Sequence, residues 1–238
     1  SDTGGAKCWG ANGSYQLGDG STATRTTPVD VTGLTSGVAK IAVGTSHTCA
    51  LTTTSGVKCW GYGPASGDGT GATKTTAANA TGLTSNVLNV VSGNQFSCAL
   101  TTSGGVKCWG ANGSGQVGDS TVTTRNAPVD VTGLTSGVKA IATSAGASHS
   151  CAITSSDSLV CWGLNTYGQL GDNSITTRTA PVSVTGLGTV KAVSVGTSHT
   201  CAILLSNNEV KCWGLNSTNQ LGDGKAVDSY TPVSSLYP

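Results

Sequence analysis

Short apolar runs separated by turns rich in Thr, Ser and Gly recur along this chain, and no stretch has a helical period. Residues 47–51 and 57–61 are two such runs on either side of a Thr-Thr-Thr-Ser-Gly turn, a pattern that predicts a β-hairpin. The same cysteine-bearing unit returns at residues 98–108, 151–161 and 201–212. The chain is therefore read as a repeat protein, whose repeat length must be settled before its fold.

The repeat length is about 50 residues, as measured between the Cys-Trp-Gly segments that begin at Cys8, Cys59, Cys108, Cys161 and Cys212. In each repeat an apolar run precedes the hairpin, a loop of the form Asn-x-x-Gly-Gln-Leu-Gly-Asp follows it, and a run such as Pro-Val-Asp-Val closes the unit. Small apolar residues at adjacent strand positions suit a sheet that is covered on both faces. The pattern predicts an all-β fold, a β-propeller of four-stranded blades, with an open solenoid as the rival.

We expect one repeat domain over residues 1–238. Its predicted units are a half repeat at 1–36 and complete repeats at 37–85, 86–136, 137–188 and 189–238. The half repeat has the Cys-Trp-Gly strand and the closing strand, but not the two strands that precede them elsewhere. The expectation is thus about five repeats, four complete and one half, in an open ring, in a longer native chain, or in a ring that another molecule completes.

Composition narrows the range of possible partners and compartments. Charged residues make up 10% of the chain and its net charge is +1, so we expect no nucleic-acid partner and no anionic membrane surface. No apolar run approaches the roughly 20 residues that span a bilayer. The absence of methionine and the nine regularly spaced cysteines predict a processed product of an oxidising compartment. We therefore expect an extracellular or cell-surface protein whose signal peptide has been removed.

The repeated segments Gly-Gln-Leu-Gly-Asp, Ser-His-Thr-Cys-Ala and Cys-Trp-Gly resemble the regulator of chromosome condensation repeat family, in its cysteine-bearing secreted bacterial type. The resemblance covers essentially the whole chain. It implies a β-propeller, which usually has seven blades in that family. The second copy departs most from the pattern, because residues 62–66 replace the Gln-Leu loop and residues 77–78 replace Pro-Val.

The cysteines of each hairpin lie 10 or 11 residues apart with a turn midway, so each pair should face itself across two strands, close enough for a bridge. The predicted pairs are Cys49 with Cys59, Cys98 with Cys108, Cys151 with Cys161, and Cys201 with Cys212. A metal site at His47, Cys49 and Cys59 is the alternative, but it lacks the Cys-x-x-Cys spacing of structural zinc. Cys8 is left over, either because its partner strand is missing or because it forms an intermolecular bond.

Three histidines, His47, His149 and His199, occupy one position of the repeat, where the second copy has Phe96. A position that accepts Phe is a packing position, and no nucleophile or carboxylate recurs beside it. Catalysis normally needs a unique constellation, whereas every polar candidate here belongs to the repeat. We therefore expect no enzyme, no cofactor and no metal.

Further repeat positions carry acidic, aromatic and amide side chains. Four aspartates precede a cation by six residues, which predicts exposed ion pairs worth about 0–1 kcal/mol; they are Asp19, Asp68, Asp119 and Asp172, before Arg25, Lys74, Arg125 and Arg178. The five tryptophans all lie in Cys-Trp-Gly strands, which predicts core between blades. Four Asn-x-Ser/Thr sequons are candidate glycosylation sites, although chance matches are expected in such a composition; they begin at Asn12, Asn79, Asn112 and Asn216.

Three functions remain. The first is a non-enzymatic extracellular structural or interaction module, with a protein partner or copies of itself, which assembles head-to-tail into a surface fibre or adhesin through its unfinished end. The second, which the resemblance brings in, is a soluble protein-binding propeller such as a secreted enzyme inhibitor. Its candidate loops are the non-repeating ones, with Tyr62, Pro64, Ser144, Ser148, Lys225 and Tyr230 as candidate contacts. The third is nucleotide exchange on a small GTPase, the activity of the family's eukaryotic founder, which the cysteines oppose.

Overall fold

The computed structural model describes residues 4–236, and nearly all of their regular structure is antiparallel β-sheet. A two-stranded sheet, β1 (Lys7–Gly10) with β2 (Arg25–Asp30), comes first in the chain. Four four-stranded sheets follow, each made of strands consecutive in sequence. They are β3 (Val38–Val43), β4 (His47–Thr52), β5 (Val57–Gly61) and β6 (Lys74–Asn79); β7 (Val87–Ser92), β8 (Phe96–Thr101), β9 (Val106–Gly110) and β10 (Arg125–Asp130); β11 (Val138–Ala142), β12 (His149–Thr154), β13 (Leu159–Gly163) and β14 (Arg178–Ser183); β15 (Val190–Val195), β16 (His199–Leu204), β17 (Val210–Gly214) and β18 (Ser229–Ser234).

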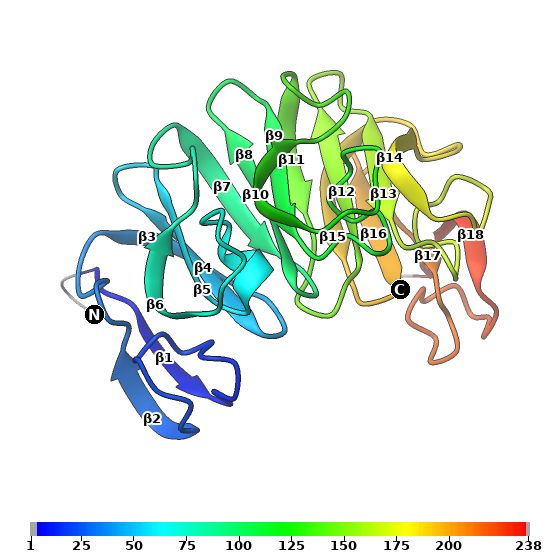
Figure 1. Ribbon diagram of the computed structural model, residues 1–238. Coiled ribbons are helices and arrows are strands. Elements are labelled where there is room, and N and C mark those ends of the chain that lie inside the picture. Colours follow the sequence, from blue (N-terminus) through cyan, green and yellow to red (C-terminus); the bar gives the residue numbers. More distant parts are fainter. Residues whose placement is uncertain (1–3, 237–238) are drawn as a thin grey trace.

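The sheets are arranged as successive blades around an arc, with β1–β2 at one end and β15–β18 at the other (Figure 1). The first strands β3, β7, β11 and β15 contact one another in turn, so they line the inner side of the arc. The all-β fold with four-stranded blades is thus confirmed. Within the described residues the blades form an open arc, and the first unit has two strands.

The Cys-Trp-Gly glycine ends the third strand of each blade with a bend. Gly61 has a φ of 97°, and the register between β5 and β6 shifts between Cys59 and Gly61. A Cβ at Gly61 would lie 2.6 Å from the Ser46 carbonyl oxygen. Only glycine therefore combines this backbone angle with such a close approach, and the bend sends the chain into the loop before the fourth strand.

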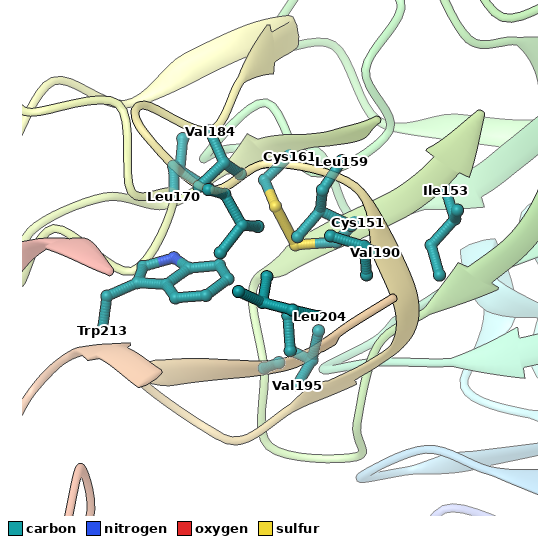
Figure 2. Packing of buried hydrophobic residues seen from close by; sticks show 13 residues of the cluster. Cys151, Ile153, Leu159, Cys161, Leu170, Val184, Val190, Val195, Leu204 and Trp213 are labelled. Atoms are coloured by element: carbon teal, nitrogen blue, oxygen red, sulfur yellow. A yellow bond between two sulfur atoms is a disulfide. The ribbon is translucent and has the colours of Figure 1, made fainter. Parts of the chain in front are cut away.

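The core lies between blades. In the junction of β11–β14 with β15–β18, Trp213 of the second blade packs beside Leu170, Val184 and the disulfide-bearing face of the first (Figure 2). Equivalent clusters fill the other junctions. Each complete blade thus has a tryptophan face toward the preceding blade and a disulfide face toward the following one, which explains why both faces of its strands are apolar.

Candidate interaction surfaces and the junctions behind them

Each complete blade contains one disulfide between its second and third strands. Cys49 lies directly opposite Cys59 in the register of β4 and β5, with their Cα atoms 4.1 Å apart and both side chains fully buried. The four bonds join Cys49 to Cys59, Cys98 to Cys108, Cys151 to Cys161 and Cys201 to Cys212, the pairs that the hairpin spacing predicts. The alternative prediction was a metal site at His47, Cys49 and Cys59. Because the two sulfurs are bonded to each other, a disulfide takes its place.

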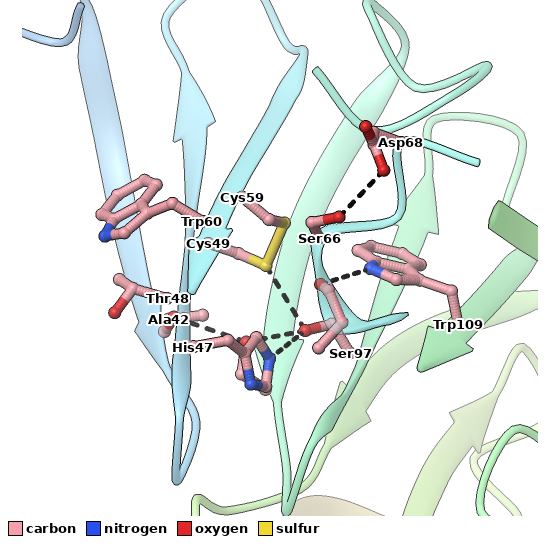
Figure 3. Close-up of a disulfide and its surroundings, with 12 residues drawn as sticks. Ala42, His47, Thr48, Cys49, Cys59, Trp60, Ser66, Asp68, Ser97 and Trp109 are labelled. Carbon is pink, nitrogen blue, oxygen red and sulfur yellow. Dashed lines mark hydrogen bonds between the residues drawn. A yellow bond between two sulfur atoms is a disulfide. The ribbon is translucent and has the colours of Figure 1, made fainter. Parts of the chain in front are cut away.

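A buried polar network lies beside the first disulfide (Figure 3). His47 Nε2 shares a 2.7 Å hydrogen bond with Ser97 Oγ of the next blade, and that hydroxyl also lies 3.3 Å from Cys49 Sγ and 3.0 Å from Ser92 Oγ. Neither His47 nor Ser97 has any exposed surface. A substrate therefore has no access to this Ser–His pair, and the histidine joins two blades.

Burial keeps the junction histidines neutral. It lowers the pKa of His47 to about 4 and that of His149 to about 3. His149 shares its hydrogen bond with Thr200 of the next blade, at 2.9 Å. Phe96 fills the same position in β8, where its ring packs against Gly93 as the His47 ring packs against Gly44. The two histidines therefore occupy packing positions, as the presence of Phe96 at the same position of the repeat indicates.

The aspartates in the loops before the fourth strands are less exposed than the sequence predicts. Asp119 was expected in an exposed pair, but its side chain is only 7% exposed. It accepts hydrogen bonds from Arg125 Nε at 2.5 Å, from the Thr121 hydroxyl at 2.8 Å and from the Asn112 amide at 3.1 Å. Asp19 and Asp172 are equally shielded, and Asp68 nearly so. All four predicted pairs form, but their expected exposure is wrong for the carboxylates, because the loop folds over each aspartate and leaves the cation the more exposed partner.

Hydrogen bonds hold these shielded carboxylates in their charged form, against the effect of burial. Burial alone would raise the pKa of Asp19, but hydrogen bonds from Ser21, Arg25 and Asn12 lower it to about 2. For Asp119 the same opposition, with Thr121 and Arg125 as the strongest donors, also leaves the pKa below its ordinary value. The loops are pinned by charge-assisted hydrogen bonds, and they offer no free carboxylate as a general acid or base.

Three of the four sequon asparagines belong to these loops. Asn12, Asn112 and Asn216 are fully buried, and the side-chain amide of each donates hydrogen bonds to an aspartate and to backbone carbonyls. A glycan on these nitrogens is incompatible with the folded loops, so the three are corrected as glycosylation candidates. Asn79, at the end of β6, is exposed and stays a candidate.

The non-repeating loops lie at one end of the propeller, because connections after the first and third strands of a blade leave from the same end. Residues 62–66 form the 3₁₀-helix η1 (Gly63–Ser66) with Gly63, Ala65 and Ser66 buried, so Tyr62 and Pro64 are only partly accessible. In the loop with Ser144 and Ser148, the Ala145 carbonyl accepts a hydrogen bond from Thr45, and that of Ala147 accepts one from Asn94 at 2.8 Å.

The loop at residues 62–66 and the loop with Ser144 and Ser148 are therefore held by contacts within the molecule. The segment with Lys225 and Tyr230 is mostly exposed, but it is also held by contacts within the molecule. The Asn216 side-chain amide donates to the Lys225 carbonyl at 2.6 Å, and Tyr230, in β18, accepts a hydrogen bond from the Asn173 N–H at 3.1 Å.

Sequence reasoning missed the acceptors of the tryptophan N–H groups. Each buried indole donates to a backbone carbonyl in the loop of the preceding blade, over 2.8–3.0 Å. The acceptors are Gln16 for Trp60, Ala65 for Trp109, Gln116 for Trp162 and Gln169 for Trp213. The acceptors lie 44 or 46 residues before their tryptophans, and each stands two residues before a glycine of the repeat, which was a signal for this contact. Only the packed blades show which atoms meet.

Trp9 and Cys8 have a different environment. Trp9 is 61% exposed, and Cys8 is a half-buried free thiol whose pKa is raised by burial. Both line a groove of about 440 Å³ between β1 and β3, together with Ile41 and Val43. Between residues 4 and 236, no helix has the length and apolar character that crossing a bilayer requires.

Comparison with known proteins agrees with this architecture. A family model described as "Regulator of chromosome condensation (RCC1) repeat" matches residues 38–67, 87–116, 140–169 and 190–220. A second model with the same description matches residues 7–51, 103–153 and 157–203, more than half of the chain.

Among curated proteins, the chain is similar to the ultraviolet-B receptor UVR8 of Arabidopsis thaliana, with 39% identity over 97 residues, 40% of this chain and 22% of that protein. It is also similar to the RCC2 homolog of Danio rerio, with 36% identity over 92 residues, 38% of this chain and 18% of that protein. The matched region thus spans about a fifth of the length of these relatives.

Two solved structures share the fold. Human WBSCR16 superposes with a TM-score of 0.82 at 23% identity, over 99% of this chain and 63% of that one. Yeast RCC1 (Prp20) in its complex with Kap60 superposes with a TM-score of 0.78 at 20% identity, over 93% of this chain and 54% of that one. With repeats matched along its length, this chain belongs to the regulator of chromosome condensation (RCC1) repeat family.

Proposed function

We propose that this chain is a non-enzymatic propeller module that works outside the reducing cytosol by binding protein surfaces, copies of itself included. The observation that carries the proposal is the set of four disulfides, one in each complete blade. Thiol-reducing compartments rarely maintain such a set, whereas an oxidising compartment forms it during folding. Three of the bonds are almost fully buried, so the blades pack on them rather than expose them for redox exchange.

Exposed aliphatic side chains at the end of the propeller that carries the loops support a protein partner. Val122 and Ile175 occupy the same position in successive loops, between the buried aspartate and its arginine, and are 59% and 55% exposed. Val227 is exposed in the next loop. Because the loops that bear them are pinned by Asp119 and Asp172, the side chains are held out rigidly, which lowers the entropy lost on binding.

Protein binding also fits what is known of relatives with this fold. One solved structure is of yeast RCC1 bound to Kap60, and another is described with the binding properties of Prp20p to Gsp1p and histones. These partners belong to those proteins. For this chain they support the general class of function, and nucleotide exchange on a GTPase is the weaker alternative because the disulfides disfavour the reducing compartments where small GTPases act.

A secreted inhibitor is the other alternative, and the exposed segment with Lys225 and Tyr230 favours it. The remaining two candidate loops disfavour it, since their candidate side chains are only partly exposed and the loop at residues 143–148 accepts hydrogen bonds from other blades. An inhibitor would form a stoichiometric complex with one enzyme and would lose it on substitution of Tyr230 alone.

The experiment that tests the proposal uses the native source. Cell-surface, secreted and cytosolic fractions are alkylated without reductant, and peptides of the chain are identified by mass spectrometry. We expect the chain in the first two fractions with all four pairs oxidised. Partners are then captured on the immobilised chain, and the Val122→Asp/Ile175→Asp variant is expected to lose them while Leu88→Asp, at an exposed site on an inner strand, keeps them. Reduced chain in the cytosolic fraction, or capture that is indifferent to the loop variant, would overturn the proposal.

A further inference from the structure

The connection between the first two strands of β11–β14 is longer than its counterparts in the other complete blades. The step from Val138, the first residue of β11, to His149, the first residue of β12, is eleven positions. The same step is nine positions in the other three blades, as from Val38 to His47. The two extra residues do not make a solvated bulge, because Ala147 of this connection is fully buried in the junction with β15–β18.

This long turn, residues 143–148, contacts the corresponding turn of each adjacent blade. The Asn94 N–H, in the turn between β7 and β8, donates to the Ala147 carbonyl at 2.8 Å. On the other side Gly146 lies against Thr197, in the turn between β15 and β16, where an added Cβ would be 2.7 Å from the Thr197 hydroxyl oxygen. Asn94 and Thr197 are the middle residues of their three-residue turns, so the long turn contacts both turns at their tips.

The long turn also reaches a blade that is not its neighbour. The Thr45 hydroxyl donates to the Ala145 carbonyl, across 100 residues of sequence. Thr45 is the middle residue of the turn between β3 and β4, and the blade β7–β10 stands between the two blades in the arc (Figure 1). Ser144 and Ala145 line a hollow of about 200 Å³ together with Val43 of β3 and Val90 of β7. One turn therefore contacts all three of the other complete blades.

Its own backbone is held in a fixed shape. The Ala147 N–H donates to the Ser144 carbonyl at 2.8 Å, which closes a tight turn inside it. The Thr143 hydroxyl donates to the His149 carbonyl, also at 2.8 Å, and ties the base of the turn to β12. A segment braced in this way can hold its contacts with other blades at a constant separation, which a freely moving loop cannot do.

We propose that residues 143–148 act as a strap that fixes the angles between the complete blades at the loop end of the propeller. The tryptophan bonds and the bonds of His47 and His149 each join consecutive blades, so each restrains one inter-blade angle. A contact that skips a blade restrains the sum of two such angles. The bond from Thr45 to Ala145 is such a contact, and this role is independent of any partner that the propeller binds.

Distances between spin labels on non-adjacent blades test the strap. Labels are attached at Thr53→Cys and Ser155→Cys, two exposed positions in the hairpin turns at the opposite end of the propeller, in a chain whose free thiol is removed by Cys8→Ser. Deleting the exposed Ala145 and Gly146 restores the nine-position step of the other blades. We expect the deletion to make the distance distribution about twofold broader, because the two blades then move about two unrestrained angles.

A point variant tests the same contact without altering the long turn. Thr45→Val keeps the shape of the side chain and removes the hydroxyl, so it should broaden the distribution and make the Asn94 amide exchange with solvent about tenfold faster. Thr176→Val, at an exposed threonine of another loop, is the matched control and should change neither. A label pair at Thr53 and Thr102, on consecutive blades, should broaden less than the non-adjacent pair in the deleted chain.

Circular dichroism and the count of free thiols confirm that each variant is folded with its disulfides formed. If the deleted chain does not fold, Thr45→Val decides alone. A distribution between Thr53 and Ser155 that stays equally narrow in the folded variants, with unchanged exchange at Asn94, would overturn the strap. That result would leave protein binding by the loop end of the propeller intact, since the capture experiment on Val122 and Ile175 measures it separately.

Discussion

The indole nitrogen of Trp109 lies 2.9 Å from the backbone carbonyl oxygen of Ala65, which precedes it by 44 residues and belongs to the neighbouring blade. The bond is buried and joins the third strand of one blade to the loop of the one before it. The same bond in three other junctions makes it the repeated link between blades. The stability of the arc should therefore depend on the buried tryptophans that make this bond, and much less on the exposed Trp9.

Trp109→Phe should lower the free energy of unfolding by about 2–4 kcal/mol, since it removes the N–H from a buried acceptor and leaves a cavity beside the disulfide. Trp9→Phe is the matched control and should change it by less than about 0.5 kcal/mol. Urea unfolding of both variants at low protein concentration measures the difference. Equal losses would contradict the assignment of the N–H bond as the link.

The junction histidines predict lower stability in mild acid. In the unfolded chain His47 and His149 bind protons below about pH 6.5. In the folded chain burial lowers their pKa to about 4 and about 3, so the unfolded state binds more protons in between. The free energy of unfolding should thus fall as pH drops through this window, by about 2 kcal/mol per histidine between pH 7.5 and pH 5.

The chain itself supplies the control, because Phe96 fills the same position in β8. His47→Phe should unfold with a pH dependence reduced by the share of one histidine, while the slope below pH 4, which comes from the aspartates, persists. Urea titrations of both chains at pH 7.5 and pH 5 give the comparison. An unchanged difference between the two pH values would show that His47 is not buried and neutral.

The buried carboxylates predict unequal effects for arginine and lysine substitutions. Arg125→Gln removes the charged donor to the shielded Asp119 carboxylate, and should cost about 1–3 kcal/mol. Lys139→Gln removes an ion pair to Asp157 that is largely exposed, and should cost less than about 1 kcal/mol. Thermal unfolding of the two variants side by side checks the order, which would be reversed or lost if the loop did not close over Asp119.

Thiol counting checks the disulfide framework directly. The unreduced, denatured chain should take up one alkylating group, at Cys8, and the reduced chain nine. Replacing Cys98 and Cys108 together by Ala should destabilise the fold by up to about 3 kcal/mol, the chain-entropy value for a loop of about 10 residues. Uptake of three or more groups without reductant would show that at least one predicted pair is open.

Expression in a eukaryotic secretory pathway tests the sequon assignments. Asn79 is exposed, whereas the amides of Asn12, Asn112 and Asn216 are buried and hydrogen-bonded. The folded, secreted product should carry at most one glycan, and Asn79→Gln should remove it without affecting secretion. Glycosidase treatment followed by intact-mass analysis measures this. Folded material with a glycan on Asn112 would contradict the loop structure.

The sequence by itself determined the repeat, its strands and the pairing of its cysteines, because these depend on short-range order: apolar runs, turns, and equal distances on either side of a hairpin. It also identified the histidine position as a packing position, since Phe96 occupies it once. What it could not determine is which groups meet between blades. The bond from Trp109 to Ala65 joins residues 44 positions apart in neighbouring blades. The burial of Asp119 and of Asn112 depends on how a single loop folds, because their mutual contact spans only 7 residues. The folding of each loop and the stacking of one sheet on the next, which only the tertiary structure shows, decide whether a polar side chain of a repeat lies in water or is buried.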